Sequence, residues 1–177
     1  MWKYICIMLM GLVTFPENPA ESIIVVRQAF TIEGDTSVGD FSCTYELDQR
    51  DTVKINGLLA ENTTVQYIIP SSAFECHNFL LNRDFKKTIK AKEYKDIRVG
   101  ISGFRKSGNH YVCNLRLRLA GKEKLYEDTV LKTTRDDLNG SLTVKFPEFD
   151  LTPPKKLGGL VKVKEDIKIS IALTVLQ

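Results

Sequence analysis

The two histidines, His77 and His110, are the side chains in this sequence best suited to metal binding. Each has a cysteine nearby, in Cys76-His77 and in His110-x-x-Cys113, and thiolate and imidazole groups are good zinc ligands. A zinc site would require the two pairs to converge. Strand alternation, however, puts His110 and Cys113 on opposite faces, and the sequence contains neither C-x-x-C nor H-E-x-x-H. We therefore expect neither a metal site nor a cofactor.

Nucleophilic and acid–base catalysis find equally little support. Ser71 and Ser72 lie shortly before His77, but the sequence has no G-x-S-x-G turn that would expose a nucleophilic serine. Carboxylates lie along polar strand faces rather than within apolar runs, so no buried acid pair is expected. Gly158-Gly159 lacks the spacing of a phosphate-binding loop. These patterns predict a protein that is not an enzyme.

Acidic and basic residues are interleaved, with 25 basic against 22 acidic side chains and a formal net charge of +3. A dedicated nucleic-acid binder would need a concentrated basic face, so we expect no nucleic-acid partner. Lysines gather most densely at Lys86, Lys87, Lys90, Lys92 and Lys95. Contact with an anionic membrane is one interpretation of this cluster, and a solvated helix face is the interpretation that we favour.

The N-terminal segment has the layout of a secretory signal peptide. Lys3 precedes an uncharged apolar run over residues 4–15, and the polar stretch PENPA follows. The run is too short to span a bilayer comfortably. We predict cleavage after Ala20, a mature domain over residues 21–177, and a periplasmic or extracellular location. A short membrane anchor and a buried strand are the alternatives.

Export would leave three cysteines, Cys43, Cys76 and Cys113, which cannot all pair within one chain. We favour a disulfide between Cys43 and Cys76, with Cys113 free and buried, because export permits the bond. The alternative is that all three are reduced and act as small apolar core residues.

Most of the chain alternates with the two-residue period of a β-strand. Ile97, Val99 and Ile101 share one face of a segment, and Leu115 and Leu117 share a face of the next, with mostly polar side chains between them. The pattern predicts seven to nine strands joined by short turns, and therefore antiparallel neighbours. A twisted sheet of this size curls or splits, so an all-β barrel or sandwich is expected.

The stretch SSAFECHNFLLNRDFKKTIKAKEY, residues 71–94, interrupts this alternation. Asn82 or Asp84 is expected to cap a short helix, on which Phe85 and Ile89 are four residues apart and share a face. A helix with one apolar face would cover an open end of a barrel. The alternative is a crossover helix packed on the outside of a sandwich.

Three segments, taken in order, resemble YceI-like proteins. They are FTIEGDTSVGDFSCTYE, IPSSAFECHNFLLNRDFKKTIKAKEYKDIRVGI and FDLTPPKKLGGLVKVKEDIKISIALTV, and the resemblance covers nearly everything after the N-terminal segment. It implies an all-β fold, an eight-stranded antiparallel lipocalin-like β-barrel with one short helix at a barrel end. It also implies binding of a long apolar lipid inside the barrel, such as a polyisoprenoid, an isoprenoid quinone or a fatty-acid derivative, with no catalytic residue.

A secreted or periplasmic lipid carrier is therefore the function that we expect, and a ligand-free barrel acting as an interaction or structural module is the alternative. Desolvation would hold the lipid, at about 0.8 kcal/mol for each buried methylene. The hydroxyls of Tyr67 and Tyr111 are candidates for bonding a headgroup. Formation of a homodimer is left open. The predicted ligand-binding residues lie on inward strand faces or on the aromatic approach to the helix: Tyr67, Ile69, Phe74, Phe79, Val99, Ile101, Tyr111, Leu115, Leu117, Leu142, Val144, Phe146, Ile169, Ile171 and Leu173.

Overall fold

The structure is a computed structural model that describes residues 21–55, 64–156 and 161–176. The predicted signal peptide with its cleavage site after Ala20 lies outside the described residues. So do Asn56-Gly57 and Gly158-Gly159, two dipeptides whose residue types predict turns. Within the described ranges, no helix is long and apolar enough to cross a lipid bilayer.

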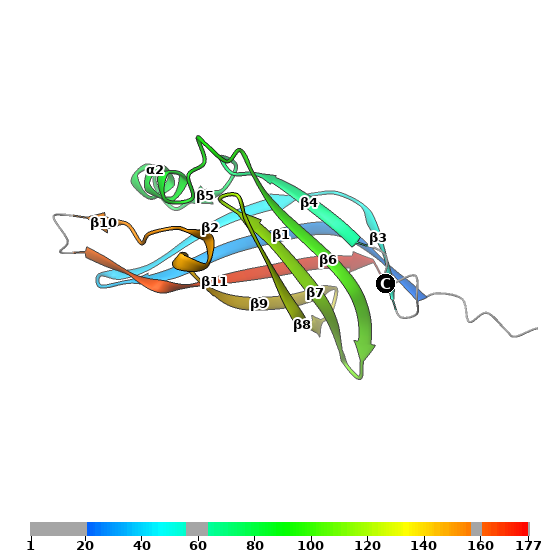
Figure 1. Ribbon diagram of the computed structural model, residues 1–177. Helices are drawn as coiled ribbons and strands as arrows, with labels where there is room; N and C mark the ends of the chain where they lie inside the picture. The colour runs from blue at the N-terminus through cyan, green and yellow to red at the C-terminus, as the bar shows by residue number, and fades with distance from the viewer. Residues whose placement is uncertain (1–20, 56–63, 157–160, 177) are drawn as a thin grey trace, which may run out of the picture.

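One antiparallel sheet organises the chain (Figure 1). Its long strands follow the order β4-β6-β7-β8-β9-β11-β1-β2, in agreement with the eight predicted strands. Three shorter segments, β3, β5 and β10, pair with β1, β2 and β11 respectively. The elements are β1 (Glu21–Thr36), β2 (Gly39–Leu47), β3 (Asp51–Ile55), β4 (Thr64–Pro70), β5 (Glu75–Cys76), α2 (Phe79–Thr88), β6 (Asp96–Ser107), β7 (His110–Leu119), β8 (Lys122–Thr134), β9 (Asp137–Lys145), the 3-10 helix η1 (Phe146–Phe149), β10 (Lys155–Lys156) and β11 (Val161–Leu176).

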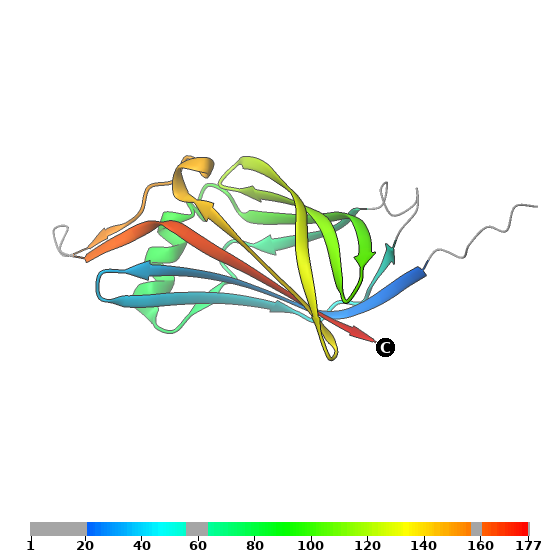
Figure 2. The ribbon, with the colours of Figure 1, turned by 90° about the horizontal axis from the view of Figure 1, so that it is seen from below.

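The sheet curls so that strands from its two ends face each other (Figures 1 and 2). The ring of Phe30 on β1 lies 5.5 Å from the ring of Tyr67 on β4, although several strands separate β1 from β4 in the sheet order. Among the described strands, no backbone pairing joins β4 to β2. Side-chain packing, such as that of Phe30 against Tyr67, therefore closes the barrel between the two ends of the sheet. The predicted all-β, lipocalin-like barrel fold is confirmed.

Side-chain alternation on neighbouring strands is also confirmed. Val99 and Ile101 on β6 are buried, as are Leu115 and Leu117 on β7, whereas Arg116 between the two leucines is exposed. In the β6–β7 register, Val99 lies opposite Leu117 and Ile101 lies opposite Leu115. The inward faces of the strands therefore join into one continuous hydrophobic core.

The predicted helix is present as α2, but it begins earlier than expected. Asn78, rather than Asn82 or Asp84, caps it, because the Asn78 side-chain oxygen accepts a 2.9 Å hydrogen bond from the Leu81 backbone N–H. Asn82 lies inside the helix, where its side-chain oxygen accepts a 2.7 Å hydrogen bond from the Cys76 backbone N–H. The apolar residues after Asn78 therefore form the first turn of the helix.

The helix α2 covers one end of the barrel (Figure 1). Ile89, directly after its last turn, is buried in the core. The ring of Phe85 lies 5.5 Å from the ring of Phe74, which is itself fully buried. The predicted shared face of Phe85 and Ile89 is thus confirmed, and it is the face by which α2 attaches to the barrel.

Alternating apolar residues in SLTVKFPEF predict one strand over this stretch, but β9 ends at Lys145 and the chain continues as η1. Pro147 has no backbone N–H to give to a neighbouring strand. The Glu148 carboxylate accepts a 2.7 Å hydrogen bond from the Lys145 backbone N–H, which caps the start of η1. Phe146 and Phe149 are buried, so both ends of η1 are anchored in the core.

Candidate functional site

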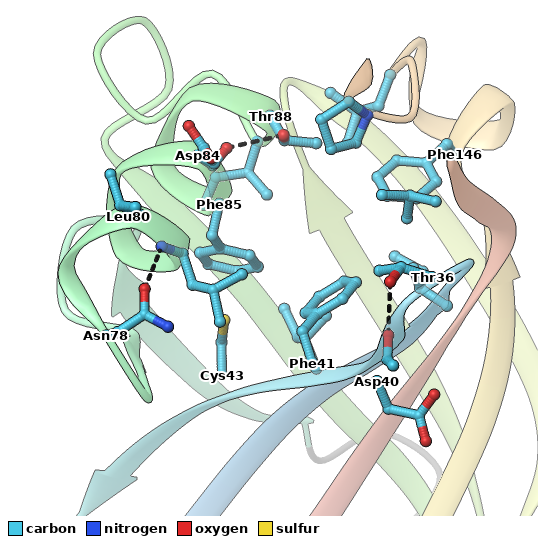
Figure 3. Close-up of a pocket in the computed structure, with 18 of the residues that line it drawn as sticks. Thr36, Asp40, Phe41, Cys43, Asn78, Leu80, Asp84, Phe85, Thr88 and Phe146 are labelled. Atoms are coloured by element: carbon cyan, nitrogen blue, oxygen red, sulfur yellow. Dashed lines mark hydrogen bonds between the residues drawn. The ribbon is translucent and has the colours of Figure 1, made fainter. Parts of the chain in front are cut away.

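A pocket of about 370 Å³ opens at the end of the barrel that α2 covers (Figure 3). Three parts of the chain surround it: α2, the hairpin of β1 and β2, and the region of η1 with the start of β11. Phe85 comes from α2, Phe41 from β2 and Phe146 from η1, and the three rings border the same space. The interior of the pocket is therefore mainly apolar.

The floor of the pocket is the end of the barrel core. Ile32 on β1, Leu119 on β7 and Ile167 on β11 line it, and each of these side chains is at most 5% exposed. Leu81 and Ile89, from α2 and the residue that follows it, line the opposite side. The pocket thus extends the hydrophobic interior of the barrel toward solvent beneath α2.

A glycine shapes the wall formed by β2. Gly34 on β1 lies opposite Phe41 on β2 in the sheet register. A side-chain carbon added at Gly34 would lie only 2.6 Å from the ring of Phe41. The absence of a side chain at Gly34 therefore lets the Phe41 ring lie close to the β1 backbone, where it forms part of the pocket wall.

Polar groups at the pocket mouth bond to their own stretch of chain. The Thr36 hydroxyl donates a 2.6 Å hydrogen bond to the Gly39 carbonyl, and the Thr88 hydroxyl donates a 2.8 Å hydrogen bond to the Asp84 carbonyl. The Asn78 side chain caps α2. These groups are used for local structure, and the arrangement presents a ligand with apolar surface rather than with a reacting group.

The predicted disulfide between Cys43 and Cys76 is present, and Cys43 lines the pocket. The bond joins β2 to β5, the short strand that leads into α2, and the same two residues are partners in the β2–β5 register. Cys113 is free and buried, and burial raises the pKa of its thiol to about 12. The disulfide therefore fastens the cover of the pocket to the barrel.

The predicted ligand-binding residues fall into distinct places. Phe146 lines the pocket, and Phe79 on the first turn of α2 is 76% exposed outside it. Tyr111 and Leu142 are half-buried beside the core. The remaining side chains are buried in the barrel core: Tyr67, Ile69, Phe74, Val99, Ile101, Leu115, Leu117, Val144, Ile169, Ile171 and Leu173. Contact of these residues with a lipid stays a prediction.

Several pocket residues were not among the predicted ligand contacts, including Ile32, Phe41, Leu119 and Ile167. The period-two pattern identifies Leu119 and Ile167 as inward-facing, because they continue the apolar faces of β7 and β11. It does not tell which end of the barrel lies beneath the helix. That information depends on long-range strand pairing, so the pattern alone could not separate pocket residues from core residues.

Tyr67 places a polar group inside the core. Its side chain is 1% exposed, and within the described residues its hydroxyl makes no hydrogen bond of good geometry. Burial, with a smaller effect from the nearby Asp51 carboxylate, raises the pKa of Tyr67 well above its ordinary value. A buried hydroxyl without a good hydrogen bond is costly. Contact of Tyr67 with a lipid headgroup stays a prediction.

The histidine–cysteine pairs weighed for zinc do not converge. Cys76 is in a disulfide and cannot offer a thiolate, and His77 is exposed. His110 and Cys113 both belong to β7, three residues apart, and Cys113 is buried in the core. In the part of the chain that the structure describes, no three His, Cys, Asp or Glu side chains are grouped to hold a metal ion.

No family model matches the sequence, and no curated protein matches it. Solved structures do match. BcnA from Burkholderia cenocepacia aligns with a TM-score of 0.58 at 18% identity, over 85% of this chain and 96% of that chain. A YCEI protein from Campylobacter jejuni aligns with a TM-score of 0.51 at 15% identity, over 65% of this chain and 73% of that chain. A mutant form of a CJ YCEI protein gives a TM-score of 0.51 at 12% identity, over 100% of this chain and 99% of that chain. These are likenesses of fold.

Proposed function

We propose that this chain, which has a YceI-like fold, is a carrier for a long apolar lipid, with the end of a prenyl or acyl chain held in the pocket beneath α2. The observation that supports this proposal is the pocket itself. Its volume of about 370 Å³ lies within the range of about 300–1,000 Å³ that is usual for small-molecule sites. Its walls are apolar side chains from α2, the β1–β2 hairpin and the barrel core.

Desolvation supplies the binding energy in this proposal. Each methylene group that leaves water for the pocket contributes about 0.8 kcal/mol. The walls offer Phe41, Phe85 and Phe146 as aromatic contacts, and Ile32 and Ile167 as aliphatic contacts. Such a pocket selects for a slender apolar chain and makes few demands on the headgroup.

The barrel interior limits how far the chain extends. Core residues such as Val99, Leu115 and Leu173 are buried against their neighbours, and protein cores are packed to crystal-like density. A ligand that reached them would have to displace side chains. In this proposal the terminal part of the lipid therefore occupies the end pocket, and the remainder extends outward past α2.

The proposal includes a periplasmic or extracellular location. The N-terminal residues have the layout of a signal peptide, with Lys3 followed by an apolar run. The Cys43–Cys76 disulfide suits an oxidising compartment outside the cytoplasm.

A ligand-free interaction or structural module is the second candidate function. The observation that favours it is the filling of the barrel centre by large side chains, among them Phe30, Tyr67 and Phe104, each at most 2% exposed. A barrel of about eight strands can be filled in this way without any ligand. The two candidates differ in whether the end pocket has an occupant.

Organic extraction of the purified protein, followed by mass spectrometry, distinguishes the two candidates. The carrier predicts a co-purifying prenyl or acyl lipid, or saturable binding of one added chain per protein after delipidation. A protein that yields no lipid and binds no added prenyl or acyl chain would contradict the carrier and leave the interaction module.

A further inference from the structure

Three large apolar side chains are exposed at the end of the barrel that α2 covers. Phe79 and Leu80 begin α2 and are 76% and 56% exposed, and Val38 at the tip of the β1–β2 hairpin is 74% exposed. Leu80 and Val38 also line the pocket, so they form its rim from opposite sides. Exposed apolar groups gathered at one place on a surface mark an interaction site more often than scattered ones do.

The same end of the molecule concentrates positive charge. The segment 79–95 contains six basic and two acidic side chains, a formal charge of +4, whereas the whole chain carries +3. The rest of the chain is therefore slightly acidic. This asymmetry makes the segment that contains α2 the part of the chain that most attracts anions.

The lysines of this segment are available to a partner. Within the described residues, no ion pair involves Lys86, Lys87, Lys92 or Lys95. Some lysines elsewhere are engaged: Lys122 pairs with Asp150, Lys164 with Asp35 and Lys168 with Glu33, at 2.7–3.0 Å. Phe79 lines one surface hollow together with the four unpaired lysines, so apolar and cationic groups are neighbours there.

This surface lies at the opposite end of the barrel from Glu21, where the described chain begins, and from Leu176, where it ends (Figure 1). The described ends of the chain, at Glu21 and Leu176, therefore do not obstruct an approach to α2 along the barrel axis. Nothing of the described chain covers Phe79, Leu80 or Val38, as their exposure shows.

We infer that the α2 end of the barrel docks on an anionic lipid bilayer, with Phe79, Leu80 and Val38 entering the headgroup region and the lysines contacting lipid phosphates. The inference rests on the proposed function, because it names the place from which the apolar chain enters the pocket. Lysines near an anionic bilayer are attracted to its surface potential, and exposed apolar side chains gain by insertion beside them. With the mouth against the bilayer, a lipid chain reaches the pocket without crossing water.

The test is co-sedimentation of the exported protein with vesicles, after its N-terminus has been identified by mass spectrometry. The vesicles contain either phosphatidylcholine alone or phosphatidylcholine with 30% phosphatidylglycerol. We expect binding to the anionic vesicles that weakens with added salt, and at least tenfold weaker binding for the triple variant K87Q/K92Q/K95Q. Phe79→Ser is expected to weaken binding at every salt concentration.

The matched control is R50Q/K54Q/K132Q, which removes the same charge from exposed positions away from α2. We expect its vesicle affinity to stay within twofold of the unaltered protein. Equal losses in both triple variants would show that only net charge matters and would overturn the docking surface. Absence of binding to anionic vesicles would overturn it as well, and would direct the basic surface toward an acidic protein.

A second readout separates this inference from the carrier function. A monomeric fluorescent acyl probe is titrated in the absence of vesicles, and K87Q/K92Q/K95Q is expected to bind it normally because these lysines do not line the pocket. Probe binding without vesicle binding would overturn the docking alone. Vesicle binding without probe binding would overturn the carrier alone.

Discussion

At the residue scale, the core contains two polar side chains whose bonding is incomplete. Gln28 is fully buried, and its amide nitrogen donates a 2.7 Å hydrogen bond to the Gln49 carbonyl, but its amide oxygen has no partner in the described structure. The Tyr67 hydroxyl, which lies near the Asp51 carboxylate, likewise makes no hydrogen bond of good geometry there. An unpaired buried polar group costs folding free energy, so it is either a defect or a contact reserved for a ligand or water.

Replacement of Tyr67 by phenylalanine tests these alternatives. Tyr67→Phe removes a hydroxyl that makes no hydrogen bond in the described structure, so the free energy of unfolding is expected to stay unchanged or to rise by about 1 kcal/mol in urea titrations. Tyr126→Phe is the control, because the Tyr126 hydroxyl donates a 3.2 Å hydrogen bond to the Glu148 carboxylate. We expect the control to lose about 1 kcal/mol.

The same Tyr67 variant also reports on the headgroup contact. In the proposed binding mode the headgroup lies outside the end pocket, so Tyr67→Phe is expected to bind a lipid with a polar headgroup and a plain alkyl chain as tightly as the unaltered protein does. Selective loss of binding for the lipid with a headgroup would place the headgroup in the core and contradict this binding mode. If Tyr67→Phe lost more unfolding free energy than Tyr126→Phe, that result would contradict the interpretation that the Tyr67 hydroxyl makes no good hydrogen bond.

At the element scale, α2 is held over the pocket by three kinds of contact. Asn78 caps its first turn, the Phe85 ring packs on Phe74, and the Cys43–Cys76 disulfide anchors the chain immediately before it. A hydrogen bond strengthens the attachment that the disulfide makes, because the Cys76 backbone N–H donates to the side-chain oxygen of Asn82 within the helix. The cover of the pocket is therefore fixed at its N-terminal side.

Removal of the disulfide should destabilise the protein and loosen this cover. The bond closes a loop between cysteines 33 residues apart, so the double variant Cys43→Ser/Cys76→Ser is expected to lose about 3–4 kcal/mol of unfolding free energy in urea titrations. Backbone amides of α2 should also exchange with solvent faster than those of β6 and β7.

Reductant provides the control for this variant. Reduction of the unaltered protein should reproduce the loss of stability, whereas the double variant should not respond to reductant. Unchanged stability of the variant, or equal acceleration of exchange in the helix and the barrel strands, would contradict the role assigned to the disulfide.

The elements also show which features the sequence could predict. Strand faces such as Leu115 and Leu117 were predictable because the two-residue period is a local property of the backbone. The start of α2 at Phe79 does not follow from the sequence pattern, because Phe79, Leu80 and Leu81 fit an apolar approach to the helix as well as its first turn. The end of β9 at Lys145 depends on Pro147, which has no backbone N–H to donate to a neighbouring strand, and the period-two pattern does not include this effect.

At the scale of the whole molecule, the barrel is filled at its centre and opens into a pocket at one end. The sequence predicts most of the inward residues and the resemblance predicts the barrel fold; the barrel fold is confirmed, and of the predicted inward residues only Tyr111 and Leu142 are half-buried rather than buried in the described structure. Neither could predict where the space inside lies, since that depends on how side chains from distant strands fill a common volume. The predicted ligand contacts all lie within the described ranges. Among them, Phe146 is therefore the one that lines the pocket.

The central claim is that the end pocket holds an apolar chain, and a pair of tryptophan variants tests it most directly. Val163 lines the pocket at the start of β11, and Val175 is half-buried on the same strand but outside the pocket. Val163→Trp fills the pocket, whereas Val175→Trp adds the same bulk at the other end of the strand.

The measurement is the affinity of each variant for a fluorescent acyl probe, after urea titration has shown comparable stability. We predict at least tenfold weaker binding for Val163→Trp and less than twofold change for Val175→Trp. Equal affinity of the two variants would contradict the account.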